Sequence, residues 1–182
     1  MDPLVQSISV TQYRVAARSC IAEALQSAAR NGKEVFVLVE PQARFDEEAN
    51  IKWASQYRDA GVQVQLGIQG LKVHSKLMHI TRREGGKDRF YTVIGTGNFN
   101  EDSATTFADH LLMTYHQGIG EDVGKIFQFF NRSYRPPVLK HLKCAPFDLR
   151  EFIRKGIRRE IVNHRAGKPS GISFKVNNFS DM

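Results

Sequence analysis

The first part of the chain alternates between strand-like and helix-like segments, and this alternation limits its fold more than any other feature. Three segments rich in apolar and β-branched side chains are predicted to be strands, at residues 7–15, 34–40 and 62–66. Between them, Ser19 precedes a helix that stops at Gly32, and Asp46 precedes a second helix that stops at Gly61. Because a β-α-β-α-β order needs crossover connections, it predicts an α/β fold with helices layered on a sheet.

A hairpin-like pair of strands follows, at residues 72–81 and 90–96, with a polar, glycine-rich segment at residues 82–89 as its exposed tip. A strand at residues 110–114 and an amphipathic helix at residues 120–130 complete the pattern.

The proline pair Pro136-Pro137 interrupts this pattern and is the predicted domain boundary. After it, Asp148 is predicted to cap an amphipathic helix that reaches about residue 164, and residues 172–176 are predicted to be a strand. One helix and one strand cannot bury a core by themselves. We therefore expect a first domain and the truncated beginning of a second, at residues 1–137 and 138–182.

Positive charge is concentrated in one stretch of the sequence. The formal net charge of the chain is +7, and residues 132–168 contain eleven Lys and Arg residues against three acidic ones. The rest of the chain is close to neutral. Such a block is typical of an anion-binding surface or of a solvated helix face, and charge alone does not separate the two.

The remaining composition excludes several classes of protein. Cys20 and Cys144 are too few for a disulfide scaffold or for a multi-cysteine zinc site. No apolar run approaches the ~18–20 residues of a membrane span. The first residues also lack the basic and apolar stretches of a signal peptide. We therefore expect a soluble, cytoplasmic chain.

Two short motifs carry the residues with the most reactive side chains. His74 and Lys76 stand two residues apart in a predicted strand, so their side chains are expected to share a face. Asn98 and Asn100 follow the neighbouring strand, in the glycine-flanked turn at residues 95–100. An imidazole, an ammonium and two amides that converge in this way can form a phosphoryl site, in which the histidine attacks phosphorus. A His-x-Lys pair alone is more often structural, and the second motif favours the phosphoryl site.

Other nucleotide-binding and hydrolytic motifs are missing from the sequence. There is no GxxxxGK[ST] P-loop, and the Gly95-x-Gly97 pair lacks the third glycine of a dinucleotide fingerprint, because Asn100 stands there. No HExxH motif, Cys/His zinc spacing or GxSxG elbow is present. A nucleoside triphosphate would therefore be handled without a P-loop.

Four segments closely resemble bacterial polyphosphate kinase, of the type with two phospholipase-D-like C-terminal domains: TQYR at residues 11–14, QARFDEEAN at 42–50, GLKVHSK at 70–76 and IGTGNFNE at 94–101. The resemblance extends from about residue 7 to residue 181. It implies a phospholipase-D-like layered mixed sheet flanked by helices. It also implies an N-terminal domain, a head domain and a complete second C-terminal domain outside this chain. A homo-oligomeric enzyme in the cytoplasm, extending to the periphery of the inner membrane, is implied as well.

The resemblance further implies a reaction. The family transfers the terminal phosphate of ATP reversibly to inorganic polyphosphate through a phosphohistidine, and His74 matches that histidine. Lys76 and Asn98 match residues that contact the phosphoryl group and the nucleotide, and Asn100 matches a further polar residue of the phosphoryl site. The second histidine of the family falls beyond residue 182. We therefore expect this chain alone to bind anions or accept phosphate on His74 without making polyphosphate.

Two arginines, Arg14 and Arg44, match the positions that the family associates with Mg²⁺. A guanidinium cannot ligate a cation, so we interpret both as clamps for phosphates beside a Mg²⁺ that the nucleotide or polyphosphate carries. Each follows a predicted strand, at the edge where open α/β sheets form their active sites. For Arg44, an ion pair with Asp46 or Glu47 is the alternative.

One position departs from the family pattern. Where the family has a tyrosine that contacts the nucleotide, in TAxxYTD, residues 103–109 read SATTFAD and Phe107 takes its place. Phe107 keeps a face on which adenine can stack and loses the hydroxyl. Asp109, at the end of the same segment, could orient His74 or cap a loop, and the sequence leaves both open.

Two other functions are compatible with parts of the sequence. A phospholipase-D-like nuclease or phosphodiesterase also uses HxK and GxxN, but the Asp that usually follows the lysine is missing, since Ile80 and Thr81 occupy that region. A non-catalytic module could bind polyanions through residues 132–168, with a steep salt dependence. Under the polyphosphate kinase interpretation the partners are ATP, ADP and polyphosphate, and nucleic acid is not expected.

Overall fold

The computed structural model describes residues 2–41, 47–174 and 176 of the chain. These residues divide into two compact units, Met1–His141 and Leu142–Met182, and each unit is described by itself.

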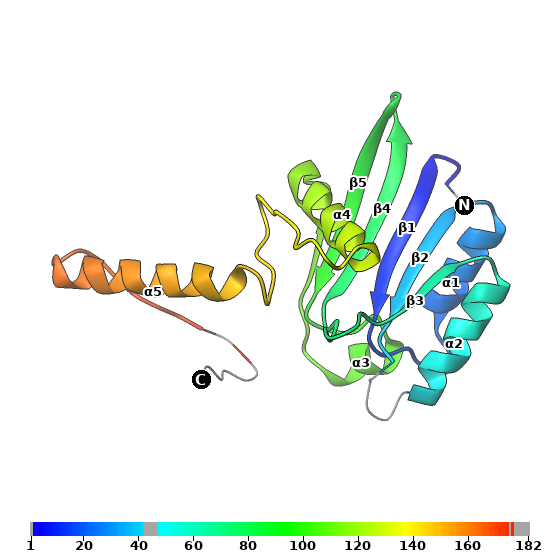
Figure 1. Cartoon of the computed structure of the whole chain (residues 1–182), viewed down its shortest axis with the longest axis horizontal. Helices are drawn as coiled ribbons and strands as arrows, with labels where there is room; N and C mark the ends of the chain where they lie inside the picture. Colours follow the sequence, from blue (N-terminus) through cyan, green and yellow to red (C-terminus); the bar gives the residue numbers. More distant parts are fainter. Residues whose placement is uncertain (1, 42–46, 175, 177–182) are drawn as a thin grey trace. The chain divides into compact units, whose positions relative to one another are not determined.

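Parallel strands form one half of the sheet in the first unit (Figure 1). They are β1 (Val5–Gln12), β2 (Glu34–Val39) and β3 (Gln63–Leu66). The connections between them are the helices α1 (Cys20–Arg30) and α2 (Glu47–Asp59), which confirms the predicted β-α-β-α-β order. Ser19 caps α1 as expected, because its Oγ accepts a hydrogen bond from Ala22 N at 3.2 Å. Asp46, the predicted cap of α2, lies outside the described residues.

Antiparallel strands form the other half of the sheet. They are β4 (Lys76–Glu84), β5 (Lys87–Gly95) and β6 (Leu111–Thr114). β4 pairs with β1, so the strand order in the described sheet is β3-β2-β1-β4-β5-β6. The sheet is mixed, as predicted, and β1 stands at the junction of its two halves.

The β4–β5 hairpin extends further toward its tip than predicted (Figure 1). The polar segment at residues 82–89 pairs as strand up to Glu84 and Lys87, and only Gly85 and Gly86 form the turn. Both glycines have a positive φ, 53° and 77°, which the tight two-residue turn of a hairpin requires. The predicted exposed loop is therefore mostly paired strand.

Helices cover both faces of the sheet (Figure 1). On one face, α1 and α2 bury the main core with β1 and β2; its members include Val10, Leu25, Val37, Trp53 and Tyr57. On the other face, α4 (Gln117–Asn131) packs against β4 and β5. The apolar stripe predicted for this helix is buried, at Val123, Ile126, Phe127 and Phe130.

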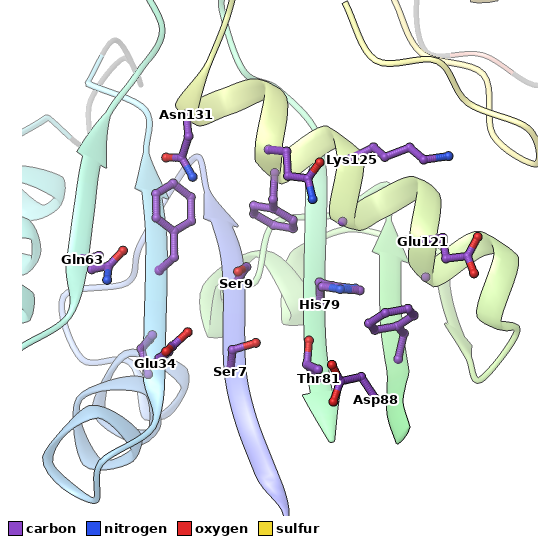
Figure 2. A pocket seen from close by; sticks show the side chains of 17 residues that line it. Ser7, Ser9, Glu34, Gln63, His79, Thr81, Asp88, Glu121, Lys125 and Asn131 are labelled. Carbon is purple, nitrogen blue, oxygen red and sulfur yellow. The ribbon is translucent and has the colours of Figure 1, made fainter. Parts of the chain in front are cut away.

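A cavity of about 710 Å³ remains beside α4, over strands that this helix leaves uncovered (Figure 2). His79 lines it and packs against Phe90 and Phe127, with ring-centroid distances of 5.1 and 6.4 Å. Burial lowers the pKa of His79 from its ordinary 6.5 to about 4, so its imidazole is neutral in the folded chain at neutral pH. The cavity is separate from the sequence-predicted site, since neither His74 nor Lys76 lines it.

A buried carboxylate determines where the first unit ends. Asp122 of α4 is 1% exposed, and its Oδ2 accepts hydrogen bonds from Lys140 N at 2.8 Å and His141 N at 2.6 Å. The segment up to His141 is therefore tied to α4, past the boundary that the sequence suggested after residue 137. That a second domain begins in this region stays a prediction.

The described part of the second unit contains one helix, α5 (Leu149–Arg165). Asp148 precedes it, but its side chain does not cap the helix, because the carboxylate accepts a hydrogen bond from Cys144 N at 2.7 Å and pairs with Lys143 at 3.0 Å. The strand predicted at residues 172–176 is wrong for the described residues of that segment, since the described part of this unit offers them no strand to pair with. No helix in the described ranges is long and apolar enough to cross a membrane.

The burial of His79 predicts a pH dependence of stability. The pKa of His79 is about 4 in the folded chain and about 6.5 when unfolded. The contribution of the neutral His79 imidazole to the free energy of unfolding is therefore fully present above pH 6.5 and is lost as the pH falls toward 4. The loss amounts to about 3 kcal/mol. Urea unfolding is measured at a series of pH values for the wild-type chain and for His79→Leu. Both proteins have the same carboxylates, so the wild-type chain should lose this much more free energy of unfolding than the variant as the pH falls. Parallel curves for the two proteins would contradict the prediction.

Candidate active site

His74 lies in the loop before β4, not within the strand as predicted. The strand begins only at Lys76, because the Thr11 hydroxyl occupies the backbone groups around it. Thr11 donates a hydrogen bond to Ser75 O at 2.7 Å and accepts one from Leu77 N at 2.9 Å. His74 and Lys76 therefore do not share a strand face. Instead, the Lys76 side chain contacts the backbone of His74.

A buried carboxylate holds the other side of this loop. Glu40, directly after β2, is 3% exposed, and its Oε2 accepts a hydrogen bond from Val73 N at 3.0 Å. The loop is thus anchored on both sides of His74, to β1 through Thr11 and to the end of β2 through Glu40. Its position follows from the strands and not from its own sequence.

The Lys76 side chain is buried and turns back toward His74. Its Nζ donates a hydrogen bond to the backbone O of His74, and the residue is 4% exposed. Burial lowers the pKa of Lys76 to about 8, while the charge of Asp109 opposes this shift and that of Arg14 adds to it. At neutral pH the amine is still mostly protonated, so it places a positive charge beside His74.

The ring of His74 packs against Tyr13. Their centroids are 4.6 Å apart and the ring planes meet at 75°, an edge-to-face contact. The residue as a whole is exposed, but this contact shields one side of the imidazole. Partial burial lowers the pKa of His74, and the charges of Lys76, Lys72 and Arg14 lower it further. The neutral, nucleophilic form of the imidazole is thereby favoured.

Asn50 fixes the backbone on both sides of Arg14. Its side chain lies in α2 and is 1% exposed. Oδ1 accepts a hydrogen bond from Val15 N at 3.2 Å, and Nδ2 donates to Tyr13 O at 3.0 Å. The same Nδ2 donates to Glu40 O, also at 3.0 Å. One buried amide therefore joins the end of β1 to the end of β2.

Arg14 stands between the two residues whose backbone Asn50 clamps, Tyr13 and Val15. It is half-buried, and its charge lowers the pKa values of both His74 and Lys76, which places the three side chains within electrostatic reach of one another. Arg44, the second predicted phosphate clamp, lies outside the described residues. Of the two arginines, the structure thus brings Arg14 to the site.

The turn that contains Asn98 meets the His74 loop at the same edge of the sheet. It begins at Gly95, which pairs with Lys76 in the β4–β5 ladder. Asn98 is half-buried, and among the described residues nothing donates a hydrogen bond to its buried Oδ1. Such an orphan acceptor costs about 1–3 kcal/mol unless a water or a ligand donates to it. Asn98 therefore retains a polar group for a further contact.

Asn100 begins a short helix, α3 (Glu101–Thr106), that the sequence analysis did not predict. Its Oδ1 caps this helix by accepting a hydrogen bond from Ser103 N at 3.0 Å, and the residue is 8% exposed. Phe107 ends the helix and is 63% exposed. The oxygen of Asn100 thus serves the fold. A phosphoryl contact through its N–H groups, and stacking of adenine on Phe107, stay predictions.

Asp109 takes the loop role of the two that the sequence left open. Its Oδ1 accepts a hydrogen bond from Thr96 Oγ1 at 2.7 Å, and that hydroxyl in turn accepts one from His110 N at 3.0 Å. Gly97 leaves room for this carboxylate, because a Cβ at this position would overlap the Asp109 side chain. The carboxylate still influences the site by opposing the lowered pKa of Lys76.

The side chains around His74 do not fit a metal ion held by the protein. In the described ranges, no cluster of three or more His, Cys, Asp or Glu side chains could hold one. The groups whose charge shifts the pKa of His74 are all cations, and cations do not coordinate Mg²⁺. The described residues around His74 therefore offer no ligand set for Mg²⁺.

Sequence reasoning gave no role to four residues that build the site, namely Thr11, Tyr13, Glu40 and Asn50. Three of them stand inside the TQYR and QARFDEEAN segments, in which only the arginines were predicted to have a role. Glu40 did carry a signal, since a carboxylate that ends an apolar strand needs a partner when it is buried. Its partner, Val73 N, could not be identified without the fold.

The hydrogen bonds of Asn50 predict a large effect of its removal. Asn50→Ala leaves Val15 N, Tyr13 O and Glu40 O without this partner, and unfolding in urea should show a loss of about 3 kcal/mol. The control is Ser55→Ala, at an exposed position of the same helix, which should change stability by less than about 0.5 kcal/mol. Equal effects of the two substitutions on stability would contradict the prediction that the Asn50 hydrogen bonds hold the site together.

Comparison with known proteins places this chain in a family. The profile described as Polyphosphate kinase C-terminal domain 1 matches residues 1–136. The chain is 45% identical over 180 residues to the polyphosphate kinase of Escherichia coli (strain K12), and 47% identical over 180 residues to that of Vibrio parahaemolyticus. Each alignment covers 99% of this chain and 26% of the relative. The chain therefore spans about a quarter of the length of the curated relatives it matches.

A solved structure agrees with the sequence relatives. The crystal structure of polyphosphate kinase from Porphyromonas gingivalis matches with a TM-score of 0.80 at 38% identity, over 92% of this chain and 28% of that one. This confirms the expected phospholipase-D-like fold class, a layered mixed sheet flanked by helices. Since the family profile also covers well over half of the residues, the chain belongs to the polyphosphate kinase family and carries its C-terminal domain 1.

Proposed function

We propose that this chain is the phosphate-accepting part of a polyphosphate kinase, in which His74 takes the terminal phosphate of ATP and passes it reversibly to inorganic polyphosphate. The observation that carries the proposal is the buried Lys76 ammonium, whose Nζ donates a hydrogen bond to the backbone O of His74; its charge and that of Arg14 lower the pKa of His74. A neutral nucleophile next to groups that can neutralise phosphate oxygens suits phosphoryl transfer to histidine. Membership of the polyphosphate kinase family supplies the substrates.

The proposed transfer consists of two displacements at phosphorus. In the first, the lone pair of a His74 ring nitrogen attacks the γ-phosphorus of ATP, an N–P bond forms, and the bond to the β–γ bridging oxygen breaks. ADP leaves with that electron pair. In the second, the terminal oxygen of a polyphosphate chain attacks, an O–P bond forms, and the N–P bond breaks to restore neutral His74. Lys76 and Arg14 stabilise the charge on the transferred oxygens in both steps.

The other predicted site residues complete the proposal. Asn98 and Asn100 offer amide N–H groups to the phosphoryl group, and Phe107 offers its exposed ring to adenine. Arg44 is proposed as a second phosphate clamp alongside Arg14. Any Mg²⁺ enters with the phosphates of ATP or polyphosphate.

Further domains complete the enzyme in this proposal. The chain covers 26% of its Escherichia coli relative, so most of a protein of that length lies outside it. We assign the remaining length to an N-terminal domain, a head domain and the rest of a second C-terminal domain, in a cytoplasmic homo-oligomer that reaches the periphery of the inner membrane. The chain alone is then expected to accept phosphate on His74 without making polyphosphate.

Labelling tests the proposed nucleophile. The chain is incubated with ATP labelled at the γ-phosphate, and in parallel with phosphoramidate, a small phosphoryl donor that needs no nucleotide site. We expect a label that is lost in acid and retained in base, and that falls at least about 100-fold in His74→Ala, because the proposal places the phosphate on this imidazole. His164→Ala, an exposed histidine of α5, is the matched control and should keep the label. Label that persists in His74→Ala, or a wild-type chain that neither donor labels, would sink the assignment.

The lowered pKa of His74 predicts its titration. Burial and three nearby cations hold this pKa below 6.5, so the imidazole stays neutral into mildly acidic solution and gains its proton only as the pH falls further. Ring-proton NMR of the folded chain should give a midpoint below that of a denatured chain. Lys72→Gln removes one of the cations and should move the midpoint upward. A midpoint at or above 6.5, or no response to Lys72→Gln, would contradict this picture.

A further inference from the structure

We infer that Tyr13 is a positioning residue whose ring sets the orientation of the His74 imidazole for phosphoryl transfer. The inference rests on the proposed function of His74. It assigns a role to a residue of the TQYR segment to which neither the sequence analysis nor the proposed reaction gives one.

The contact between the two rings restricts how His74 can turn. Their centroids are 4.6 Å apart at an interplanar angle of 75°. The positive edge of one aromatic ring attracts the negative face of another, so an edge-to-face pair selects an orientation, which mere apolar contact does not. The nucleophilic lone pair of imidazole lies in the ring plane. An aromatic contact that limits rotation of that plane therefore limits the direction of attack on phosphorus.

The same ring also gathers the cations of the site. Lys76 Nζ lies 5.0 Å from the Tyr13 centroid, and Lys72 Nζ lies 5.5 Å from it. Both distances are within the range of a cation–π interaction. A carboxylate could hold two ammonium groups as well, but it would raise the pKa of His74 and repel phosphate. An aromatic ring attracts cations without adding a negative charge, which suits a site that must receive an anion.

The backbone holds the Tyr13 ring in place. Tyr13 directly follows β1, and its carbonyl accepts the hydrogen bond from Asn50 Nδ2 at 3.0 Å. In the described part of the chain, the Tyr13 hydroxyl makes no hydrogen bond with the protein. The ring, and not the hydroxyl, is therefore assigned the positioning role, and this distinguishes Phe from smaller replacements.

The expected consequences follow from the loss of the ring. Tyr13→Phe keeps both the edge-to-face contact and the cation–π contacts, so phosphorylation of His74 should stay within about twofold of wild type. Tyr13→Leu keeps apolar bulk but removes the π system. His74 then samples several orientations and the two lysines lose a partner, so the phosphorylation rate should fall on the order of tenfold.

The experiment compares wild type, Tyr13→Phe, Tyr13→Leu and Tyr13→Met in the full 182-residue chain. Phosphoramidate is the probe, and the rate of acid-labile phosphate appearing on His74 is one readout. The second readout is the chemical shift of the His74 ring protons, which the Tyr13 ring displaces in wild type and Tyr13→Phe but not in the aliphatic variants. The dispersion of the remaining NMR signals checks that each variant is folded, and Met replaces Leu if the Leu variant is not.

The outcomes separate this inference from the proposed function. Slow phosphorylation and altered His74 shifts in the folded aliphatic variants, with both restored by Phe, support it. Wild-type rates in a folded aliphatic variant overturn it, and so does a Phe variant as slow as Leu, since the hydroxyl would then be responsible. If wild type is not phosphorylated at all, the proposed function fails; the His74 shifts then decide whether Tyr13 orients the ring.

Discussion

The buried amide of Asn50 is the constraint on which the site depends. β1 and β2 end side by side, and beyond their ends the backbone loses the ladder that satisfied its N–H and C=O groups. Asn50 supplies three of the missing partners, at Val15 N, Tyr13 O and Glu40 O. Because Asn50 belongs to α2, the helix that packs the core also closes the polar end of the sheet. The turn that contains Tyr13 and Arg14 is therefore held in place by a helix that is itself fixed in the core.

The double pairing of β1 explains why a histidine loop can meet this turn. β1 is parallel to β2 on one side and antiparallel to β4 on the other, so the end of β1 and the beginning of β4 lie at one edge of the sheet. Open α/β sheets form their sites where parallel strands end, and here an antiparallel strand delivers His74 to that edge. Thr11 and Glu40 then hold the incoming loop from both sides.

Periodicity and caps were enough to predict most of the fold, because the β-α-β-α-β order and the α4 stripe are local patterns. The errors arose where a distant partner decides. Residues 72–75 alternate like a strand, yet Val73 N is bound by Glu40, which lies 33 residues away in sequence. The sequence of residues 172–176 also resembles a strand, and the described part of the unit that contains them offers no strand to pair with. Asn100 caps α3 through its Oδ1, a short helix that the sequence did not predict, and its phosphate contact stays a prediction.

The site shows the same difference between features that are local in the sequence and features that depend on distant residues. His74, Lys76 and Arg14 could be predicted as site residues from the sequence, because their side chains have reactive or charged groups. Sequence reasoning gave no account of Tyr13, whose importance comes from contacts with residues far along the chain. A positioning residue does not react itself, so its role can be inferred only from its contacts in the folded chain.

The electrostatics of the chain show two different uses of positive charge. Residues 132–168 hold eleven basic residues, and α5, which spans much of that block, has no buried residue. Around His74, three cations of the described residues lower its pKa. Lys76 and Lys72 lie against the Tyr13 ring, and Arg14 leaves a backbone that Asn50 clamps on both sides. Cations fixed before phosphate arrives need no reorganisation as charge develops, whereas free lysines lose rotamer entropy on binding. If the site receives phosphate as proposed, its affinity will therefore depend on where these three charges are held, and the net charge of +7 is a poor guide to it.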